Sequence, residues 1–336
     1  GTGNKPVRAI LKKIGVEDVT VVPEQEYPDG NFPTCPFPNP EIKEALAKGL
    51  ELCNVVKPDL LLATDPDCDR VGIAVPSDNG YELFTGNEVG AMLLEYICSE
   101  RTKMGTMPAD PVAVKTIVTT DIAAKIAKEY GVKLIEVLTG FKFIGEQIGF
   151  LEDKGQEDRY IFGFEESYGY LAGSYVRDKD AVVASMLICE MAAFYRTKGI
   201  SLIQARENMY KKYGVYVHSQ SSFVCEGVTG MERMKEIMSD LRTNTPKTIG
   251  GLTVTRFEDY LASTSVDTAT GAKTMLTLPK SDVLTFKLTD GASVIIRPSG
   301  TEPKIKAYYT TTGTTKAEAA ALEKTISDDF AKILGF

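Results

Sequence analysis

The sequence predicts two tandem α/β domains with mixed sheets covered by helices, followed by a smaller α+β domain with an antiparallel sheet. Up to about residue 213, short apolar runs of strand length alternate with segments of helical periodicity. From about residue 215, the pattern changes to strands joined by turns. A chain of 336 residues is long enough for two or three hydrophobic cores. We therefore place domains at residues 1–106, 107–214 and 215–336.

The composition narrows the class of protein. The chain is 43% hydrophobic and 25% charged, as is usual for soluble globular proteins, and no apolar run approaches the length that spans a membrane. The net charge of −8 argues against nucleic-acid and anionic-membrane partners. Six scattered cysteines without C-x-x-C spacing indicate reduced thiols rather than a disulfide framework or a zinc site. No signal-peptide pattern opens the chain, so we expect a cytoplasmic protein.

The first domain is predicted from its turns and helix caps. A Gly-rich turn at residues 1–6 leads into a helix over 7–15; because such a turn normally follows a strand, we expect the chain to begin inside a domain. A short strand is expected at 19–23, and then a helix with Asn39 as its N-cap and Pro40 at its first position. A buried strand at 59–63, a second strand at 71–75, a turn at 78–80 and a helix that includes 89–97 complete the domain.

The other two domains are predicted in the same way. The second should contain strand 112–118, helix 121–130, strand 132–138, a loop at 139–143 that leads into a helix, strand 159–164, and helices over 179–197 and 201–213. The third should contain a strand from 215, helix 231–241, strand 252–257, a polar stretch at 263–274, a hairpin across 289–291, strand 304–310 and helix 315–334.

Three carboxylates at alternate positions follow the strand at 59–63. Asp65, Asp67 and Asp69 can point the same way in an extended loop and so bind one hard cation, Mg²⁺ or Ca²⁺. An EF-hand does not fit, because Arg70 stands where that motif has Gly. A dehalogenase-type phosphatase with an aspartate nucleophile stays open. So does an acidic turn without metal, although a cation or Arg70 must then offset the repulsion between the carboxylates.

Residues 297–303 have the composition of an anion-binding turn between two strands. The segment and its neighbour supply an arginine, a serine, a glycine, a threonine and a lysine: Arg297, Ser299, Gly300, Thr301 and Lys304. The glycine permits a turn with exposed amides, the hydroxyls add hydrogen-bond donors, and the arginine can bind two oxygens of one anion. A well-made turn without a ligand is the alternative.

Polar residues at three further places suit a sugar phosphate. Glu165 and Ser167 follow a strand and offer acceptors to vicinal sugar hydroxyls, although a solvated acidic turn explains them equally well. Lys179 is either a proton donor or phosphate ligand in a cleft, or a flanking charge beside a helix whose N-cap is Asp178. Lys142 is likewise a cleft residue or a surface lysine.

Taken in order, these motifs resemble the α-D-phosphohexomutase superfamily, the phosphoglucomutases and phosphomannomutases. The resemblance rests on Asp65-Pro-Asp-Cys-Asp-Arg70 as the metal loop, Glu165-Glu-Ser-Tyr-Gly169 as the sugar loop and Arg297-Pro-Ser-Gly-Thr-Glu-Pro303 as the phosphate loop. Residues 139–143 are similar to the superfamily's specificity loop, and residues 1–3 to a turn of its second domain. The resemblance covers essentially the whole chain and implies domains two to four of a four-domain fold.

The resemblance also implies what is missing. The superfamily's nucleophile is a phosphoserine in a Ser-His-Asn motif of the first domain, whereas the only histidine here, His218, lies in Val-His-Ser. We therefore expect a fragment that does not turn over alone, whose partner is the first domain of the same polypeptide.

For the complete enzyme, the resemblance implies Mg²⁺-dependent phosphoryl transfer between phosphoserine and a hexose 1-phosphate or 6-phosphate, through a hexose 1,6-bisphosphate. The implied metal ligands are Asp65, Asp67 and Asp69. Arg70 and Lys179 are the candidates for the reacting end, with Lys179 as a general acid or base. The implied substrate-binding residues are Thr139, Gly140, Lys142, Glu165, Ser167 and Arg177. The implied ligands of the non-reacting phosphate are Arg297, Ser299, Gly300, Thr301 and Lys304.

The sequence leaves the substrate open. Glucose is our first expectation and mannose the second, because the sugar loop would bind hydroxyls that the two share. A phosphopentomutase, a sugar-bisphosphate synthase of the same superfamily, the dehalogenase-type phosphatase and a non-catalytic sugar-phosphate-binding chain are the alternatives.

Overall fold

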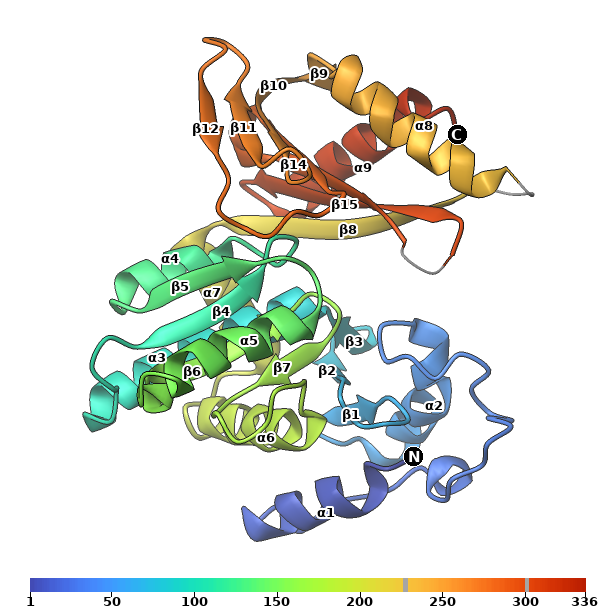
Figure 1. Ribbon diagram of the computed structural model, residues 1–336. Helices are drawn as coiled ribbons and strands as arrows, with labels where there is room; N and C mark the ends of the chain where they lie inside the picture. The colour runs from blue at the N-terminus through green and yellow to red at the C-terminus, as the bar shows by residue number, and fades with distance from the viewer. Residues whose placement is uncertain (226–228, 300–301) are drawn as a thin grey trace. The chain divides into compact units, whose positions relative to one another are not determined.

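The computed structural model describes residues 1–225, 229–299 and 302–336. These residues form two compact units, Gly1–Tyr213 and Gly214–Phe336 (Figure 1). The fold is mixed α/β in the first unit and has an antiparallel sheet in the second, as the sequence predicts. The first two predicted domains lie inside the first unit except for Gly214, and their boundary at residue 106 stays a prediction. No helix in the described ranges is both long and apolar enough to cross a membrane.

The first part of the first unit is an antiparallel sheet with helices around it (Figure 1). The sheet has the order β1-β2-β3, and its helices lie before and after it in the sequence. The elements are α1 (Asn4–Lys13), α2 (Ala47–Val56), β1 (Leu61–Thr64), β2 (Val71–Ser77), β3 (Gly80–Phe84) and α3 (Gly86–Met104). The turn at 78–80 joins β2 and β3 as predicted. The mixed sheet expected here is instead antiparallel, and β1 is only half-buried.

Two predicted elements of this region do not form as expected. Residues 19–22 are not a strand, because the described strands of the sheet provide no neighbour for them, and Pro23 begins a short 3₁₀ helix, Pro23–Gln25. Asn39 does not cap a helix either. Its side-chain Oδ1 accepts a hydrogen bond from the backbone N–H of Glu41 at 3.0 Å, which closes a local turn. Helical structure begins only with the 3₁₀ segment Lys43–Leu46, which leads into α2.

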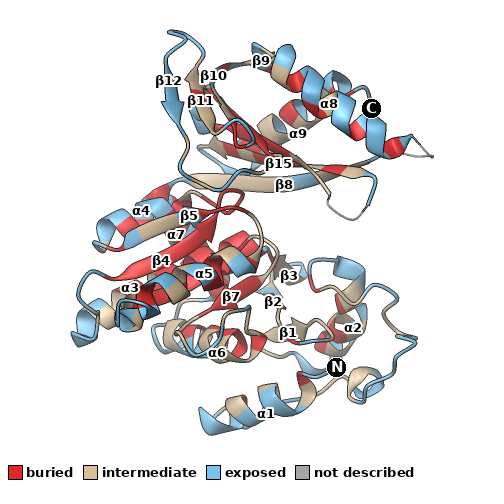
Figure 2. Cartoon of the chain, viewed as in Figure 1, coloured by how far each residue is buried: buried red, intermediate tan, exposed pale blue. Residues whose placement is uncertain are grey.

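The second part of the first unit contains the predicted mixed sheet. Its strand order is β5-β4-β6-β7, with β4 parallel to β5 and β6, and β7 antiparallel to β6. Its elements are β4 (Val112–Thr116), α4 (Ile122–Glu129), β5 (Lys133–Val137), α5 (Phe141–Glu152), β6 (Tyr160–Glu165), β7 (Gly169–Leu171), α6 (Ala181–Thr197) and α7 (Leu202–Tyr213). The strands β4, β6 and β7 are buried throughout (Figure 2). Apolar residues of α5, such as Ile144 and Ile148, pack on this sheet and form its core.

A buried arginine ties α7 to the first sheet. Arg206 is 3% exposed, and its Nη1 lies 2.6 Å from Glu82 on β3 and 3.4 Å from Glu88 on α3. Its guanidinium lies over the ring of Phe84 at 4.6 Å. Glu88 also accepts from the backbone N–H of Thr85, in a capping box that starts α3. The ion pairs of Arg206 therefore join α7, β3 and α3 at one buried point.

The second unit is an antiparallel sheet covered by two helices, α8 (Gly230–Thr243) and α9 (Lys316–Ile333). The strand order is β12-β11-β10-β13-β14-β15-β8, with β9 (Thr248–Ile249) paired to β10. The strands are β8 (Val215–Val224), β10 (Leu252–Asp259), β11 (Thr264–Asp267), β12 (Lys273–Met275), β13 (Leu284–Leu288), β14 (Ser293–Pro298) and β15 (Lys304–Gly313). Phe286 and Ile296 of the sheet pack with Phe330 of α9 in the core.

One prediction for the second unit is wrong. The stretch 263–274, expected to be merely polar, contains β11 and most of β12, which form a hairpin. Asp267 closes its turn by accepting from the backbone N–H of Thr270 at 2.9 Å, and Gly271 has φ 72°. The sequence did not predict these strands, because β12 is exposed and its residues do not alternate between apolar and polar.

Candidate functional site

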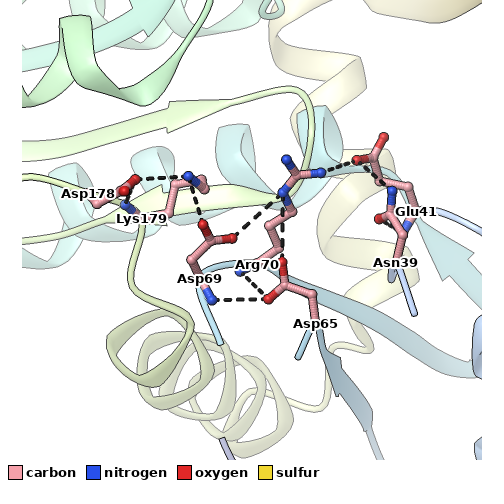
Figure 3. Close-up of polar contacts among 7 residues, drawn as sticks. All are labelled: Asn39, Glu41, Asp65, Asp69, Arg70, Asp178 and Lys179. Atoms are coloured by element: carbon pink, nitrogen blue, oxygen red, sulfur yellow. Dashed lines mark hydrogen bonds and ion pairs between the residues drawn. The ribbon is translucent and has the colours of Figure 1, made fainter. Parts of the chain in front are cut away.

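The aspartate loop, residues 65–70, joins β1 to β2 and is held by its own first carboxylate. Oδ1 of Asp65 accepts hydrogen bonds from the backbone N–H groups of Asp69 and Arg70, each at 3.0 Å (Figure 3). The chain reverses at Cys68, which has φ 63° and donates its N–H to the carbonyl of Asp65 at 3.2 Å. The side chain of Asp65 therefore holds the loop in its shape by accepting hydrogen bonds from the loop's own backbone.

The three aspartates fit a divalent cation. Asp65, Asp67 and Asp69 each offer a carboxylate oxygen, and these oxygens lie within 4.8 Å of one another. Oδ1 of Asp69 is buried and has no hydrogen-bond partner among the described residues, as expected of an atom that needs a cation. Burial, with the nearby charges of Asp69 and Asp67, raises the pKa of Asp65 to about 6. A hard cation that prefers oxygen ligands, such as Mg²⁺, would offset the repulsion between these carboxylates.

Two cationic side chains flank the aspartates (Figure 3). Nζ of Lys179 lies 2.9 Å from Asp69 and 2.8 Å from Asp178. Burial disfavours the charge on Lys179, but the hydrogen bonds with Asp178 and Asp69 outweigh it and raise the pKa of the lysine, which is an ammonium at neutral pH. Nε of Arg70 lies 3.7 Å from Asp69 and 3.9 Å from Asp65. The negatively charged aspartates therefore lie beside the positively charged side chains of Lys179 and Arg70.

The sugar loop, residues 165–169, is bonded to the aspartate loop through the backbone. The N–H of Val71 donates to the carbonyl of Tyr168 at 3.2 Å, and Arg70 and Gly169 form an isolated antiparallel bridge. The N–H of Ala181, at the start of α6, donates to the carbonyl of Cys68 at 3.2 Å. Three predicted segments are therefore joined by main-chain hydrogen bonds, which side-chain rotation cannot undo.

The close approach of these segments requires a glycine. A Cβ on Gly169 would lie 2.4 Å from Cδ and 2.7 Å from Cγ of Lys179, and 3.0 Å from Cγ of Glu165. Glu165 is 6% exposed, and burial raises the pKa of its carboxyl although the charge of Lys179 opposes this. Lys179 and Glu165 thus lie together beside the aspartate loop.

Some predicted residues stand differently from expectation. Asp180, not Asp178, is the N-cap of α6: its carboxylate accepts from the N–H groups of Val182 at 2.8 Å and Val183 at 3.1 Å. The helix therefore begins two residues later than predicted, and this leaves Asp178 available to bond Lys179.

The specificity segment also differs. Helix α5 begins at Phe141, after Gly140 with φ 113°, so Lys142 lies in its first turn rather than in the loop. Lys142 is exposed, with its Nζ 4.9 Å from the ring of Phe143. Thr139 is half-buried just before the helix. Arg177 pairs with Glu152 at the end of α5, so its side chain is held by that helix.

Sequence reasoning missed three contacts of this site. Glu41 forms an ion pair with Arg70 at 2.9 Å, across 29 positions of sequence. The ring of Phe141 lies 5.5 Å from Nζ of Lys179. Glu166 accepts from Thr116, the last residue of β4, and from Thr119 in the turn that follows, and burial with the charge of Glu165 raises its pKa to about 7. The sequence carried no local signal for any of them, because each partner lies far along the chain.

The phosphate loop belongs to the second unit and is described by itself. Arg297 lies near the end of β14, and its Nη2 donates to the hydroxyl of Tyr308 at 3.1 Å. The N–H of Ser299 donates to the carbonyl of Lys304 at 2.8 Å, and the hydroxyl of Ser299 accepts from the N–H of Glu302 at 3.3 Å. Nζ of Lys304 is paired with Glu302 at 2.5 Å. The predicted ligands Gly300 and Thr301 lie outside the described residues.

Comparison with curated proteins shows phosphoglucomutases that are similar to most of this chain. Phosphoglucomutase of Staphylococcus aureus (strain MRSA252) is 37% identical over 309 residues, which are 92% of this chain and 54% of that protein. Phosphoglucomutase of Staphylococcus saprophyticus is 35% identical over 310 residues, 92% of this chain and 55% of that protein. The chain thus spans about half the length of the curated relatives that it matches.

Solved structures agree on the fold. The phosphoprotein pp63/parafusin of Paramecium, a phosphoglucomutase, aligns with a TM-score of 0.63 at 20% identity over 88% of this chain and 50% of that chain. A phosphoglucomutase/phosphomannomutase family protein of Burkholderia thailandensis aligns with a TM-score of 0.63 at 16% identity over 99% of this chain and 58% of that chain. At these identities the likeness concerns the fold alone.

The family models divide the chain in the order that the motifs predict. Residues 1–79 match α/β/α domain II of phosphoglucomutase/phosphomannomutase, residues 85–213 match α/β/α domain III, and residues 242–328 match the C-terminal domain. Together these matches cover well over half of the chain and contain the aspartate, sugar and phosphate loops. The chain therefore belongs to the phosphoglucomutase/phosphomannomutase family and carries its domains II, III and IV.

Proposed function

We propose that this chain is the metal-, sugar- and phosphate-binding part of a phosphohexomutase that interconverts hexose 1-phosphate and hexose 6-phosphate. The observation that carries the proposal is the joining of the aspartate loop, the sugar loop and the start of α6 by main-chain hydrogen bonds. Such a platform holds cation ligands, sugar ligands and a charged lysine in one place. Glucose is the first candidate sugar, because the curated relatives are named phosphoglucomutases.

The aspartates would hold the cofactor. Asp65, Asp67 and Asp69 would bind Mg²⁺, as their clustered oxygens suggest, together with Oδ1 of Asp69, which has no hydrogen-bond partner among the described residues. Bound there, the ion would neutralise charge on the phosphoryl group during its transfer. The loop itself needs little rearrangement, because Asp65 already holds it closed through two backbone N–H groups.

The other residues would orient the sugar phosphate and move one proton. Arg70 would bind the reacting phosphoryl group, and Lys179, which is protonated at neutral pH, would donate a proton to the sugar oxygen that leaves. Glu165 and Ser167 would accept hydrogen bonds from sugar hydroxyls. Thr139, Gly140, Lys142 and Arg177 are proposed as further substrate contacts from the resemblance.

The non-reacting phosphate would bind to the second unit. Arg297 would grip two phosphate oxygens, with Ser299, Gly300, Thr301 and Lys304 around it. Because the phosphoserine motif is absent from this sequence, we propose that the chain binds a hexose bisphosphate but does not turn over without the first domain.

A calorimetric titration tests this proposal. The chain is titrated with glucose 1,6-bisphosphate in the presence of Mg²⁺, beside an Arg297→Ala variant and an Arg256→Ala control, whose arginine is exposed on β10 of the same unit. Binding that Arg297→Ala loses and Arg256→Ala keeps supports the phosphate assignment. Equal binding by all three, or no binding by a folded chain, contradicts it. Mutase turnover by the chain alone would contradict the proposed need for the first domain.

The same titration separates the alternatives. Mannose 1,6-bisphosphate and a pentose 1,5-bisphosphate replace the glucose compound to test the hypotheses that the protein is a phosphomannomutase or a phosphopentomutase. A sugar-bisphosphate synthase would also form the bisphosphate once a first domain is restored. Family membership favours these over a dehalogenase-type phosphatase, whose signature would be hydrolysis that Arg297→Ala leaves unchanged. Binding without phosphoserine-dependent activity after a first domain is restored would favour a non-catalytic binding chain.

A further inference from the structure

The guanidinium of Arg70 is held more firmly by Glu41 than by the aspartates beside it. Its Nη1 lies 2.9 Å from Oε1 of Glu41, within hydrogen-bond distance. Its Nε lies 3.7 Å from Asp69 and 3.9 Å from Asp65, beyond that distance. In Figure 3, Glu41 lies to the right of the Arg70 guanidinium, Asp69 to its left and Asp65 below it. The side chain of Arg70 therefore makes its hydrogen bond with Glu41, and its contacts with the two aspartates are longer ion pairs.

Glu41 itself is fixed by its own segment. Oδ1 of Asn39 accepts from the backbone N–H of Glu41 at 3.0 Å, and this sets the direction in which the chain carries the glutamate. Pro40 is buried, and its carbonyl oxygen lies so close to Gly72 of β2 that a Cβ there would be 2.9 Å away. The segment 39–41 is thus packed against the strand that begins just after Arg70.

The arrangement has two groups that a ligand could use. Oδ1 of Asp69 is buried without a hydrogen-bond partner among the described residues, and the contacts of the Arg70 guanidinium with Glu41 and the aspartates are made by Nη1 and Nε rather than Nη2. Oδ1 of Asp69 suits a cation and Nη2 of Arg70 an anion. Without Glu41, the same guanidinium could close on Asp69 and Asp65 and occupy the space that a divalent cation needs.

We propose that Glu41 is a positioning residue, which keeps Arg70 off the metal-binding aspartates and turned toward the anionic ligand. The inference rests on the proposed function, since it takes Asp65, Asp67 and Asp69 as metal ligands. It assigns to Glu41 a role that is exerted through Arg70. Because the side chains of Arg70 and Glu41 are 32% and 33% exposed, the effect of losing the pair is modest, about two- to fivefold in metal affinity.

Mg²⁺ titration of the whole chain by calorimetry tests the inference without any need for turnover. Glu41→Ala should bind Mg²⁺ about two- to fivefold more weakly than the unchanged chain, and Glu41→Gln, which keeps a hydrogen-bond acceptor, should recover part of the loss. In an Arg70→Met background, Glu41→Ala should have no such effect, because the competing guanidinium is gone. Glu44→Ala, an exposed glutamate three positions on, is the matched control and should bind as the unchanged chain does.

The outcomes separate this inference from the proposed function. Unchanged Mg²⁺ affinity in Glu41→Ala, or an equal loss in the Arg70→Met background, overturns the positioning role and leaves the metal site standing. Asp67→Asn reports on the site itself: if it binds Mg²⁺ as the unchanged chain does, the metal assignment fails and this inference fails with it. Circular-dichroism melting of each variant shows that a lost affinity does not reflect an unfolded chain.

Discussion

Replacing Gly169 by alanine tests how tightly the sugar loop and α6 are packed. The added methyl group would lie 2.4 Å from Cδ and 2.7 Å from Cγ of Lys179, well inside van der Waals contact. These atoms belong to the middle of the side chain, whose end is held by Asp69 at 2.9 Å and Asp178 at 2.8 Å. The lysine cannot move aside without giving up these ion pairs, and Glu165 closes the other side.

The expected cost follows from the two ways in which the clash can be relieved. If Lys179 stays, the strain of an overpacked buried site should lower the free energy of unfolding by about 1–3 kcal/mol. If Lys179 swings out, the ion pairs are lost instead, and the bisphosphate affinity should fall together with the stability. Either route destabilises the first unit, because β7 is buried.

Urea unfolding followed by circular dichroism measures the effect, since the chain has no tryptophan for fluorescence. Gly149→Ala in α5 is the control, because a Cβ there meets nothing within 4 Å. It should raise the free energy of unfolding by about 0.5–1 kcal/mol, as alanine favours a helix interior over glycine. Equal stability of Gly169→Ala and the unchanged chain would refute the packing argument.

Three further changes test other parts of the first unit by the same unfolding measurement. Arg206→Met should lower the free energy of unfolding by about 3–5 kcal/mol, because it leaves the buried Glu88 without its cationic partner. Arg196→Met removes an exposed ion pair and should change the free energy of unfolding by no more than about 0.5 kcal/mol. Similar losses in both variants would contradict the structural role of the buried Arg206. Burial raises the pKa of Glu166 from 4.5 to about 7, so the folded chain holds this proton more tightly and stability falls as pH rises between those values. Glu166→Gln should therefore be more stable than the unchanged chain at pH 8, by at most about 3 kcal/mol, and similar to it at pH 4; a gain that is the same at both pH values would count against the raised pKa. Asp180→Ala should lower the free energy of unfolding by about 1 kcal/mol, because α6 loses its N-cap, and Asp178→Ala should lower it clearly less. A larger loss for Asp178→Ala would indicate that Asp178 is the N-cap instead.

Much of the candidate site could be predicted because its signals are local. The alternating aspartates of residues 65–69 follow an apolar run, and the sugar loop follows another, so both loops could be placed at strand ends from sequence alone. The hairpin turns at 78–80 and 289–291 are likewise short-range features, since Gly and Asp adopt the needed backbone angles. Errors arose where several residues compete for one role, as Asp178 and Asp180 do at the start of α6.

The sequence by itself determined most of the helices and core strands, and it placed the aspartate and sugar loops at the ends of strands. Periodicity and turn chemistry act over a few residues, and the chain records them directly. Only the tertiary structure decided that Arg70 pairs with Glu41, that Lys179 reaches Asp69 over Phe141, and that Gly169 leaves room for it. These contacts join segments that are far apart in sequence, and they exist because the packing of α6 and the two sheets brings the segments together.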